Sequence, residues 1–268
     1  MKSISTYISE KLSIKSSVKK YNKIPKDRHE LSNIIDEAIV VRGNDADLND
    51  IDVSQIDDMS GLFRFLHHSG IIQKIDISDW DVSNVTRMAN MFRDCEKFNG
   101  NLSSWDVSKV EDMSGMFYNC LRFEGDLSQW DVSNVIDFGS MFSSCGKFNS
   151  DLSHWNVSRA RIMMSMFSWC KNFNQDISKW DVSDVRVMSW MFFDCESFNQ
   201  DISGWNVSKV EEFKHMFERC KKFNQDLSKL NVNENANIVN MFDDCPSMKE
   251  LPKWYIEMEK IQNPIMPF

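Results

Sequence analysis

The chain has 268 residues, a net charge of −9 at pH 7, and a composition that is 42% hydrophobic and 26% charged. These values indicate a folded globular protein rather than a disordered one. The excess of acidic residues argues against nucleic acid as a partner, because polyphosphates are bound through Lys and Arg. No apolar run reaches the ~18 residues that a transmembrane helix needs, so we expect no membrane span.

The first 30 residues form a basic arm. They hold eight Lys or Arg against three acidic residues, a charge of +5 (8 − 3), which leaves −14 for the remainder. We expect the arm to lie against acidic surface of the same chain or to stay mobile; contact with a membrane or polyanion is the alternative. The arm lacks the apolar stretch of a signal peptide, which predicts a cytoplasmic location.

A helix is predicted next, over residues 27–42 (DRHELSNIIDEAIVVR), with Asp27 at its start and Gly43 just past its end. We interpret it as a cap on the array that follows. Residues 1–45 are therefore assigned to the basic arm and a capping helix.

A repeat of about 25 residues occupies residues 46–248. Eight such units are recognisable, and several residue types recur at that one interval. The recurring columns are Cys95, Cys120, Cys145, Cys170, Cys195, Cys220 and Cys245; Trp80, Trp105, Trp130, Trp155, Trp180 and Trp205; and Phe98, Phe123, Phe148, Phe173, Phe198 and Phe223.

Each unit is predicted to contain a short strand followed by a helix. Val110, Met113, Met116, Phe117 and Cys120 share one stripe of a helix of about three turns. The segment 101–103 before it has the character of a short extended strand. Because parallel strands are spaced more closely than helices, the sequence predicts an α/β repeat solenoid. Its arc resembles a leucine-rich repeat, with short parallel strands on the concave side, short helices on the convex side and helical caps at both ends.

The end units depart from the pattern. The first contains an insertion that includes His67 and His68, and the last has Leu230 in place of Trp. Residues 252–260 (PKWYIEMEK) predict a closing helix with Pro252 near its first position. We assign 249–268 to a C-terminal cap.

Units such as DLSQWDVSNVIDFGSMFSSCGKFN (residues 126–149) resemble the BspA-type leucine-rich-repeat family. That family is built around a W-D-V-S-N-V stretch, an M-x-x-M-F helix and a following C-x-x-F-N. The resemblance implies a bacterial binding scaffold with an adhesive or unassigned role, without naming a ligand. It also makes the cell surface the alternative location.

No catalytic residue, metal site or cofactor is predicted. The cysteines lack metal-ligand spacing, and side-by-side helices would hold them too far apart for disulfides, so we expect free buried thiols. The aspartates in D-x-S segments, such as Asp126 and Asp131, are interpreted as turn or cap residues, with calcium as the alternative. The histidines occupy unrelated positions, and no catalytic motif is present.

The Trp column is interpreted as core, with carbohydrate stacking as the alternative. Residues that break the repeat are more informative about function. If Met163 faces inward, the rotation of about 100° per residue in an α-helix places several large apolar side chains on the convex surface, where other units have polar residues. These are Trp169, Trp190, Phe193, Ile162, Met164 and Val187.

Such a patch predicts an interaction site. We therefore expect a non-enzymatic scaffold that binds a partner protein through the patch, with self-association as a further possibility. The alternative is a surface adhesin that binds host matrix or glycan.

Overall fold

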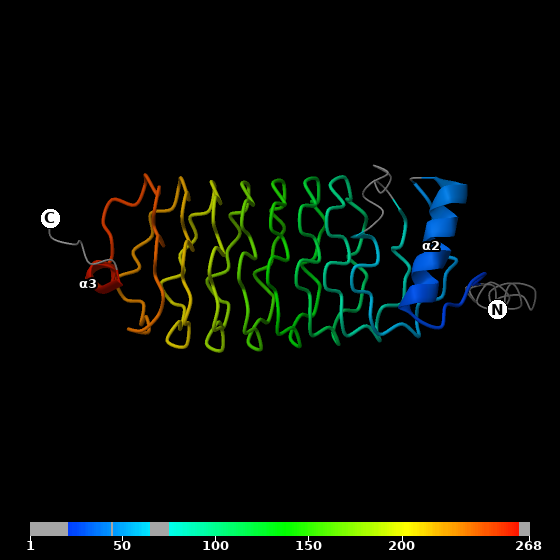
Figure 1. The fold of residues 1–268 in the computed structure, drawn as a ribbon, viewed down its shortest axis with the longest axis horizontal. Coiled ribbons are helices and arrows are strands. Elements are labelled where there is room, and N and C mark those ends of the chain that lie inside the picture. The colour runs from blue at the N-terminus through cyan, green and yellow to red at the C-terminus, as the bar shows by residue number, and fades with distance from the viewer. Residues whose placement is uncertain (1–20, 44, 65–74, 263–268) are drawn as a thin grey trace, which may run out of the picture.

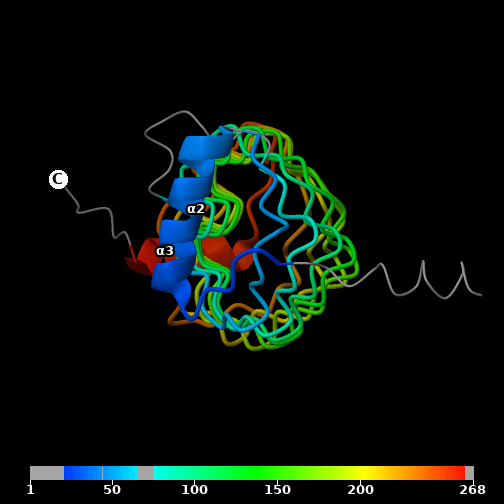
Figure 2. The same cartoon turned by 90° about the vertical axis from the view of Figure 1, so that its right-hand side faces the viewer.

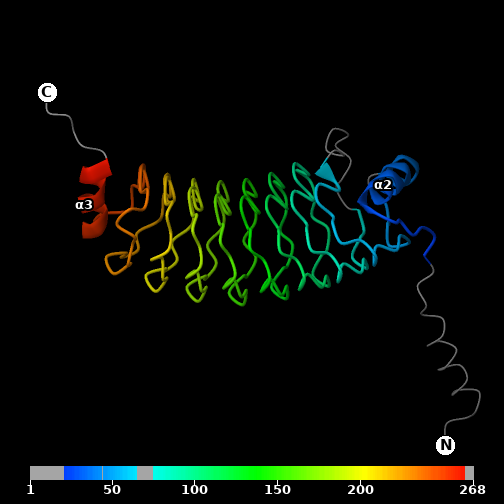
Figure 3. The ribbon, with the colours of Figure 1, turned by 60° about the horizontal axis from the view of Figure 1, so that its bottom comes forward.

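The computed structural model describes residues 21–43, 45–64 and 75–262. Successive units lie side by side along one axis, with helix α2 (Arg28–Arg42) at one end and α3 (Lys253–Gln262) at the other (Figure 1). Viewed along that axis, the units overlie one another in a common outline (Figure 2). Figure 3 shows that they follow one another in chain order.

The predicted α/β architecture of the repeat is wrong. The described residues contain two helices, α2 and α3, and no strand. The β-type pairing between neighbouring units is limited, in the described residues, to isolated parallel bridges such as Asp137 with Ile162 and Ile162 with Val187. The units therefore have neither the strands of a concave sheet nor the helices of a convex surface, and they consist mostly of turns and irregular chain.

Hydrogen bonds explain why the predicted helices are absent. In residues 163–169, alternate amides donate to carbonyls of the next unit; Phe167 donates to Met191 and Trp169 to Phe193, at 2.9 and 2.7 Å. The amides between them donate three residues back within the unit, as Ser168 does to Ser165 at 3.1 Å. An α-helix would keep all of these bonds within its own segment.

Left-handed backbone completes the turns. In each of the seven units after the first, two residues four positions apart have positive φ, for example Gly115 at 60° and Asn119 at 58°. A right-handed helix needs φ near −63° and cannot contain them. Because the turns nevertheless direct Met163, Met166, Phe167 and Cys170 into the core, each 0% exposed, the inward spacing imitates that of a helix.

Aromatic columns fill the core between units. Phe167 packs 3.9 Å from Phe173 within its unit, and 5.7 and 5.8 Å from Phe142 and Phe192 of the two adjacent units, between ring centroids. The predicted Trp column is also buried: the indole of Trp155 is 3% exposed and donates to the Leu127 carbonyl of the preceding unit at 3.0 Å. The interpretation of this column as core is confirmed.

The two predicted terminal helices are present. Asp27 caps α2 by accepting a hydrogen bond from the Glu30 amide at 2.9 Å, and Gly43 ends the helix with φ 79°. Leu31 and Ile35 bury one face of α2, while Tyr255 is buried on α3.

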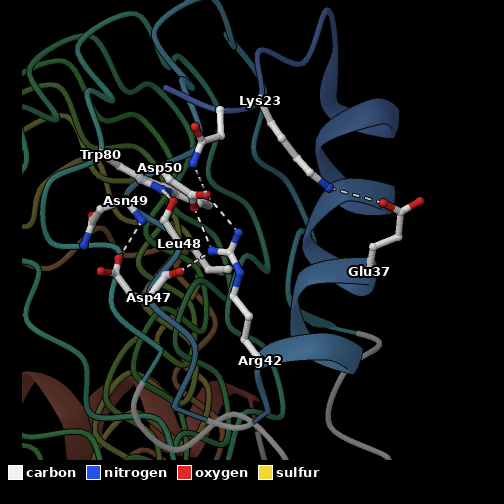
Figure 4. A network of polar contacts seen from close by, with 9 residues as sticks. Lys23, Glu37, Arg42, Asp47, Leu48, Asn49, Asp50 and Trp80 are labelled. Carbon is white, nitrogen blue, oxygen red and sulfur yellow. Dashed lines mark hydrogen bonds and ion pairs between the residues drawn. The ribbon is translucent and has the colours of Figure 1, made fainter. Parts of the chain in front are cut away.

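A polar network fastens α2 to the first unit (Figure 4). Arg42 donates to both carboxylate oxygens of Asp50, at 2.7 and 2.8 Å, and to the Asp47 carbonyl at 2.6 Å. Lys23 adds an ion pair with Glu37 at 3.2 Å. The hydrogen bond from Arg42 is the main cause that lowers the pKa of Asp50 to about 2.

Replacing Arg42 with Met is expected to lower the free energy of unfolding by about 1–2 kcal/mol at pH 7, because solvent screening reduces the value of a pair at the surface. Because the pKa of Asp50 is lower in the folded than in the unfolded chain, its carboxylate stabilises the fold. This stabilisation is fully present above the unfolded pKa of ~3.9 and is lost as pH falls through about 2. Urea denaturation of both proteins from pH 7 to pH 2 tests this. A stability difference that stayed constant over that range would contradict the role of Asp50.

Candidate functional site

The six predicted site residues lie in two adjacent units and not on helices; four are in turns, and Ile162 and Val187 form an isolated bridge between the units. Ile162, Met164 and Trp169 belong to one unit, and Val187, Trp190 and Phe193 to the next. The predicted convex helix face is therefore corrected to a surface of stacked turns. The larger exposed side chains are Trp169 and Met164, each 39% exposed, and the other four are partly buried.

The patch contains two aromatic groups. The rings of Trp169 and Phe193 lie 5.6 Å apart, and the Arg219 guanidinium lies 5.2 Å from the first and 5.8 Å from the second. Trp190 instead stacks on His215 of the following unit at 5.2 Å. We call the six predicted residues, together with Arg219 and His215, the Trp169 patch.

Lysines also border the patch. The ammonium of Lys171 lies 6.0 Å from the Trp169 ring, and that of Lys214 lies 5.6 Å from the Trp190 ring. Cations at these distances are attracted to the indole faces. Lys171 also pairs with Glu196 at 2.9 Å, and Lys221 pairs with the same carboxylate at 2.8 Å. These two lysines lower the pKa of Glu196 to about 2.

A buried carboxylate lies beside the Trp169 patch. Asp194 is 1% exposed; Arg219 Nε lies 3.3 Å from one carboxylate oxygen and Lys171 Nζ 4.0 Å from the other. Within the described residues, neither oxygen accepts a hydrogen bond. Burial of such a group is costly. Equivalent positions hold the uncharged Asn119 and Ser144 in two earlier units, and Asp94 in another, where the carboxylate is 29% exposed.

Sequence reasoning missed Arg219, Lys171, Lys214, His215 and Asp194. The repeat register contains part of the signal, because positions 169, 194 and 219 form one column, as do 190 and 215. Side chains in one column of stacked units lie near each other whatever the local backbone. The reach of Arg219 past Asp194 to Trp169 could not be read from spacing.

Both tryptophans have left-handed backbone. The φ angle is 62° at Trp169 and 56° at Trp190. The equivalent positions of most other units hold Asn, Asp, Gly or Ser with the same left-handed backbone, and Arg219 and His215 hold them in the unit after Trp190. Gly and Asn tolerate this conformation best. A bulky aromatic residue there costs about 1–3 kcal/mol.

The aspartates of the D-x-S segments form turns. Asp126 accepts a hydrogen bond from the Ser128 amide at 2.9 Å, and Asp131 accepts one from Ser133 at 3.0 Å. The bonds to Ser128 lower the pKa of Asp126. Their interpretation as turn residues is confirmed. Over the described ranges, no group of three or more His, Cys, Asp or Glu is placed to hold a metal ion.

The seven cysteines are free and buried, as predicted, although not in helices. Each thiol contacts the carbonyl oxygen of a Phe in the preceding unit, as Cys170 does with Phe142 at 2.8 Å. Burial raises the pKa of every one of them, to about 12 for Cys95 and Cys245. His67 and His68 of the insertion lie outside the described residues.

A comparison with known families identifies the chain. The family described as "Mycoplasma protein of unknown function, DUF285" matches residues 29–155 and 137–254. No curated protein and no solved structure matches the chain. Membership of the BspA-type family is not confirmed by these comparisons. Neither described helix is long and apolar enough to cross a membrane. Since the two matches together span more than half of the sequence, the chain belongs to the DUF285 family of repeat-containing proteins of unknown function.

Proposed function

We propose that this chain is a non-catalytic binding protein and that a partner protein contacts the Trp169 patch. The observation that carries the proposal is that Trp169, 39% exposed, and Trp190, partly exposed, occupy left-handed positions that hold Asn, Asp, Gly or Ser in most other units. Two exposed or partly exposed indoles occupy positions where Asn or Gly would avoid strain. Strain of this kind is typical of functional sites, and Trp is enriched among residues that dominate binding energy.

The surroundings of the Trp169 patch favour a partner with acidic and apolar groups. Arg219, Lys171 and Lys214 border the indoles. Lys171 and Arg219 pair with Glu196 and Asp194, so Lys214 supplies the positive charge that is left for a partner. A second copy of an acidic chain would be repelled over most of its surface. We therefore favour a different protein over self-association.

Replacing Trp169 and Trp190 with Ser together is expected to weaken partner binding at least 100-fold, in line with the loss of two hot-spot residues. The stability should stay constant or rise by about 1 kcal/mol, because Ser carries less strain at positive φ. Affinity capture with the intact chain identifies the partner; calorimetry with the purified pair and thermal melting of both forms then test the prediction.

The matched control is Leu121→Ser, which removes an exposed apolar side chain outside the patch (43% exposed). It should leave partner binding unchanged. If the double variant binds as tightly as the intact chain, or if it unfolds, the Trp169 patch is not the binding surface.

The BspA-type resemblance supports a second proposal, a surface adhesin for host matrix or glycan. Because the indoles of the Trp column are 3–4% exposed from Trp80 to Trp205, they cannot stack on a sugar ring. A glycan or matrix ligand would have to use the exposed Trp169 instead. Loss of glycan-array or matrix binding in the same double variant, without any captured protein, would favour the adhesin.

A further inference from the structure

The last unit of the array is not followed by another repeat unit. In every earlier pair, the alternate amides of one unit donate to the next; His215, Phe217 and Arg219 donate to the carbonyls of residues 239, 241 and 243, each at 2.9 Å. The equivalent amides of the last unit belong to Asn240, Phe242 and Asp244. No further unit follows them, because the chain turns into α3.

Helix α3 replaces part of the missing unit. The Gln262 side chain accepts from the Ile238 amide at 3.1 Å and donates to the Ala236 carbonyl at 2.7 Å. Trp254 donates to the Leu227 carbonyl at 2.9 Å, the bond that the Trp column makes elsewhere. Within the described ranges, the amides of Asn240, Phe242 and Asp244 have no acceptor. We call these three amides the C-terminal edge.

A cavity of about 750 Å³ adjoins the C-terminal edge, a volume typical of ligand clefts. Its apolar wall consists of Phe242, Cys245, Met248 and Leu251, and Leu251 is 40% exposed. The Tyr255 ring of α3 lies 5.0 Å from that of Phe242, so the helix covers part of this end. The unpaired amides and the cavity lie together beside it, and no residue of α3 lines the cavity.

The charge of the cavity is acidic. Of its two basic residues, Arg219 lies 3.3 Å from Asp194, and Lys221 lies 2.8 Å from Glu196. Asp243 and Asp244 also line the cavity, and neither forms an ion pair within the described part of the chain. Burial, Glu218 and Asp244 raise the pKa of Asp243. A cation would relieve this repulsion.

We propose that the C-terminal edge binds an extended peptide segment of another protein. Alternate carbonyls of the peptide accept from Asn240, Phe242 and Asp244, an apolar side chain fills the cavity, and a Lys or Arg pairs with Asp243 or Asp244. These contacts would reproduce, between two chains, the hydrogen bonds that join one unit to the next within this chain. Arg219 borders both the cavity and the Trp169 ring, but the three amides, Asp243, Asp244 and Leu251 lie outside the Trp169 patch. The proposal does not depend on that patch.

A second copy stacked end to end is the rival occupant. Its first unit would have to present its outward carbonyls, but α2 lies at that end (Figures 1 and 2). The Arg28 guanidinium of α2 already donates to the Ser60 carbonyl. The helix therefore disfavours end-to-end stacking.

The test uses a synthetic peptide of residues 214–222 (KHMFERCKK) with serine in place of Cys220. Within the chain, the carbonyls of Lys214, Met216 and Glu218 accept from the preceding unit, so the segment already has the required bonding pattern. Hydrogen exchange of the intact protein, followed by NMR, should slow at least tenfold at Asn240, Phe242 and Asp244 when this peptide is added. A peptide with its Lys and Arg replaced by Glu should bind at least tenfold more weakly.

Asp243→Lys and Leu251→Asp should each weaken binding of the basic peptide at least tenfold. Glu124→Lys, a charge change at an exposed site in the middle of the array, should leave this binding unchanged. Trp169→Ser should also leave this binding unchanged, which separates the proposal from that for the Trp169 patch. Absence of binding, unchanged exchange at the three amides, or concentration-dependent end-to-end assembly of the chain would overturn the proposal.

Discussion

Alanine in place of Phe192 is expected to lower the free energy of unfolding by about 4 kcal/mol, whereas alanine at the adjacent Phe193 should lower it by about 1 kcal/mol. Phe192 is 0% exposed, and its ring lies 4.0 Å from Phe198 and 5.6 Å from Phe217. Truncation leaves a cavity that neighbouring rings cannot fill without breaking their own stacking. The partly exposed Phe193 contacts Trp169 instead, at 5.6 Å.

Urea denaturation of the two variants, followed by circular dichroism, measures the difference. The pair is matched because the residues are adjacent and the chemical change is identical. Phe193→Ala should also weaken partner binding, since that ring belongs to the Trp169 patch. Equal losses of stability would show that the two rings are buried alike and that Phe193 is not a surface residue.

The repeat register and the core could be predicted from the sequence. A residue that recurs in every unit faces the same environment in each, so the Cys, Trp and Phe columns identified the buried side chains without knowledge of the backbone. The terminal helices were also predictable, because capping residues such as Asp27 and Gly43 act locally.

The backbone of the units could not be predicted from apolar spacing. A helix and the observed chain of turns both direct residues i, i+3, i+4 and i+7 to one side, so Met163, Met166, Phe167 and Cys170 are compatible with either. The decisive difference is the pair of left-handed residues, four positions apart, in the turns of a unit. Gly115, Asn90 and Asn119 are residue types that indicate left-handed backbone, whereas Trp169 gives no such indication.

Only the apolar half of the candidate site could be predicted from the sequence. Large apolar residues that break a polar column are visible in a sequence, and Trp169 is exposed. The charged half of the site depends on side-chain reach. Arg219 extends across one complete unit to the Trp169 ring, and Asp194 is buried next to it. Such contacts depend on three-dimensional packing.

Alkali is expected to unfold the protein between about pH 9 and pH 11, because the buried thiols cannot ionise in the folded state. Burial raises the pKa of all seven cysteines, to about 12 for Cys95 and Cys245. Their contribution to stability is fully present below the unfolded thiol pKa of ~8.5 and is lost as pH rises toward the folded values. Above pH ~8.5 each thiol costs about 1.4 kcal/mol per pH unit, or about 10 kcal/mol per unit for seven, which equals the whole stability of a typical domain.

The variant that tests this replaces Cys145, Cys170 and Cys195 with Ser. Serine keeps a donor for the Phe carbonyls of the preceding units but does not ionise in this range. The slope of unfolding free energy against pH should fall to about 6 kcal/mol per unit, which is four thiols at about 1.4 each. Both proteins contain the same lysines and tyrosines, so the difference in slope reports the thiols alone. Thiol reagents should react slowly with the native protein at pH 8. After unfolding without reductant, the same reagents should modify seven thiols per chain. Identical slopes, or fast reaction in the native state, would mean that the thiol column is accessible to water.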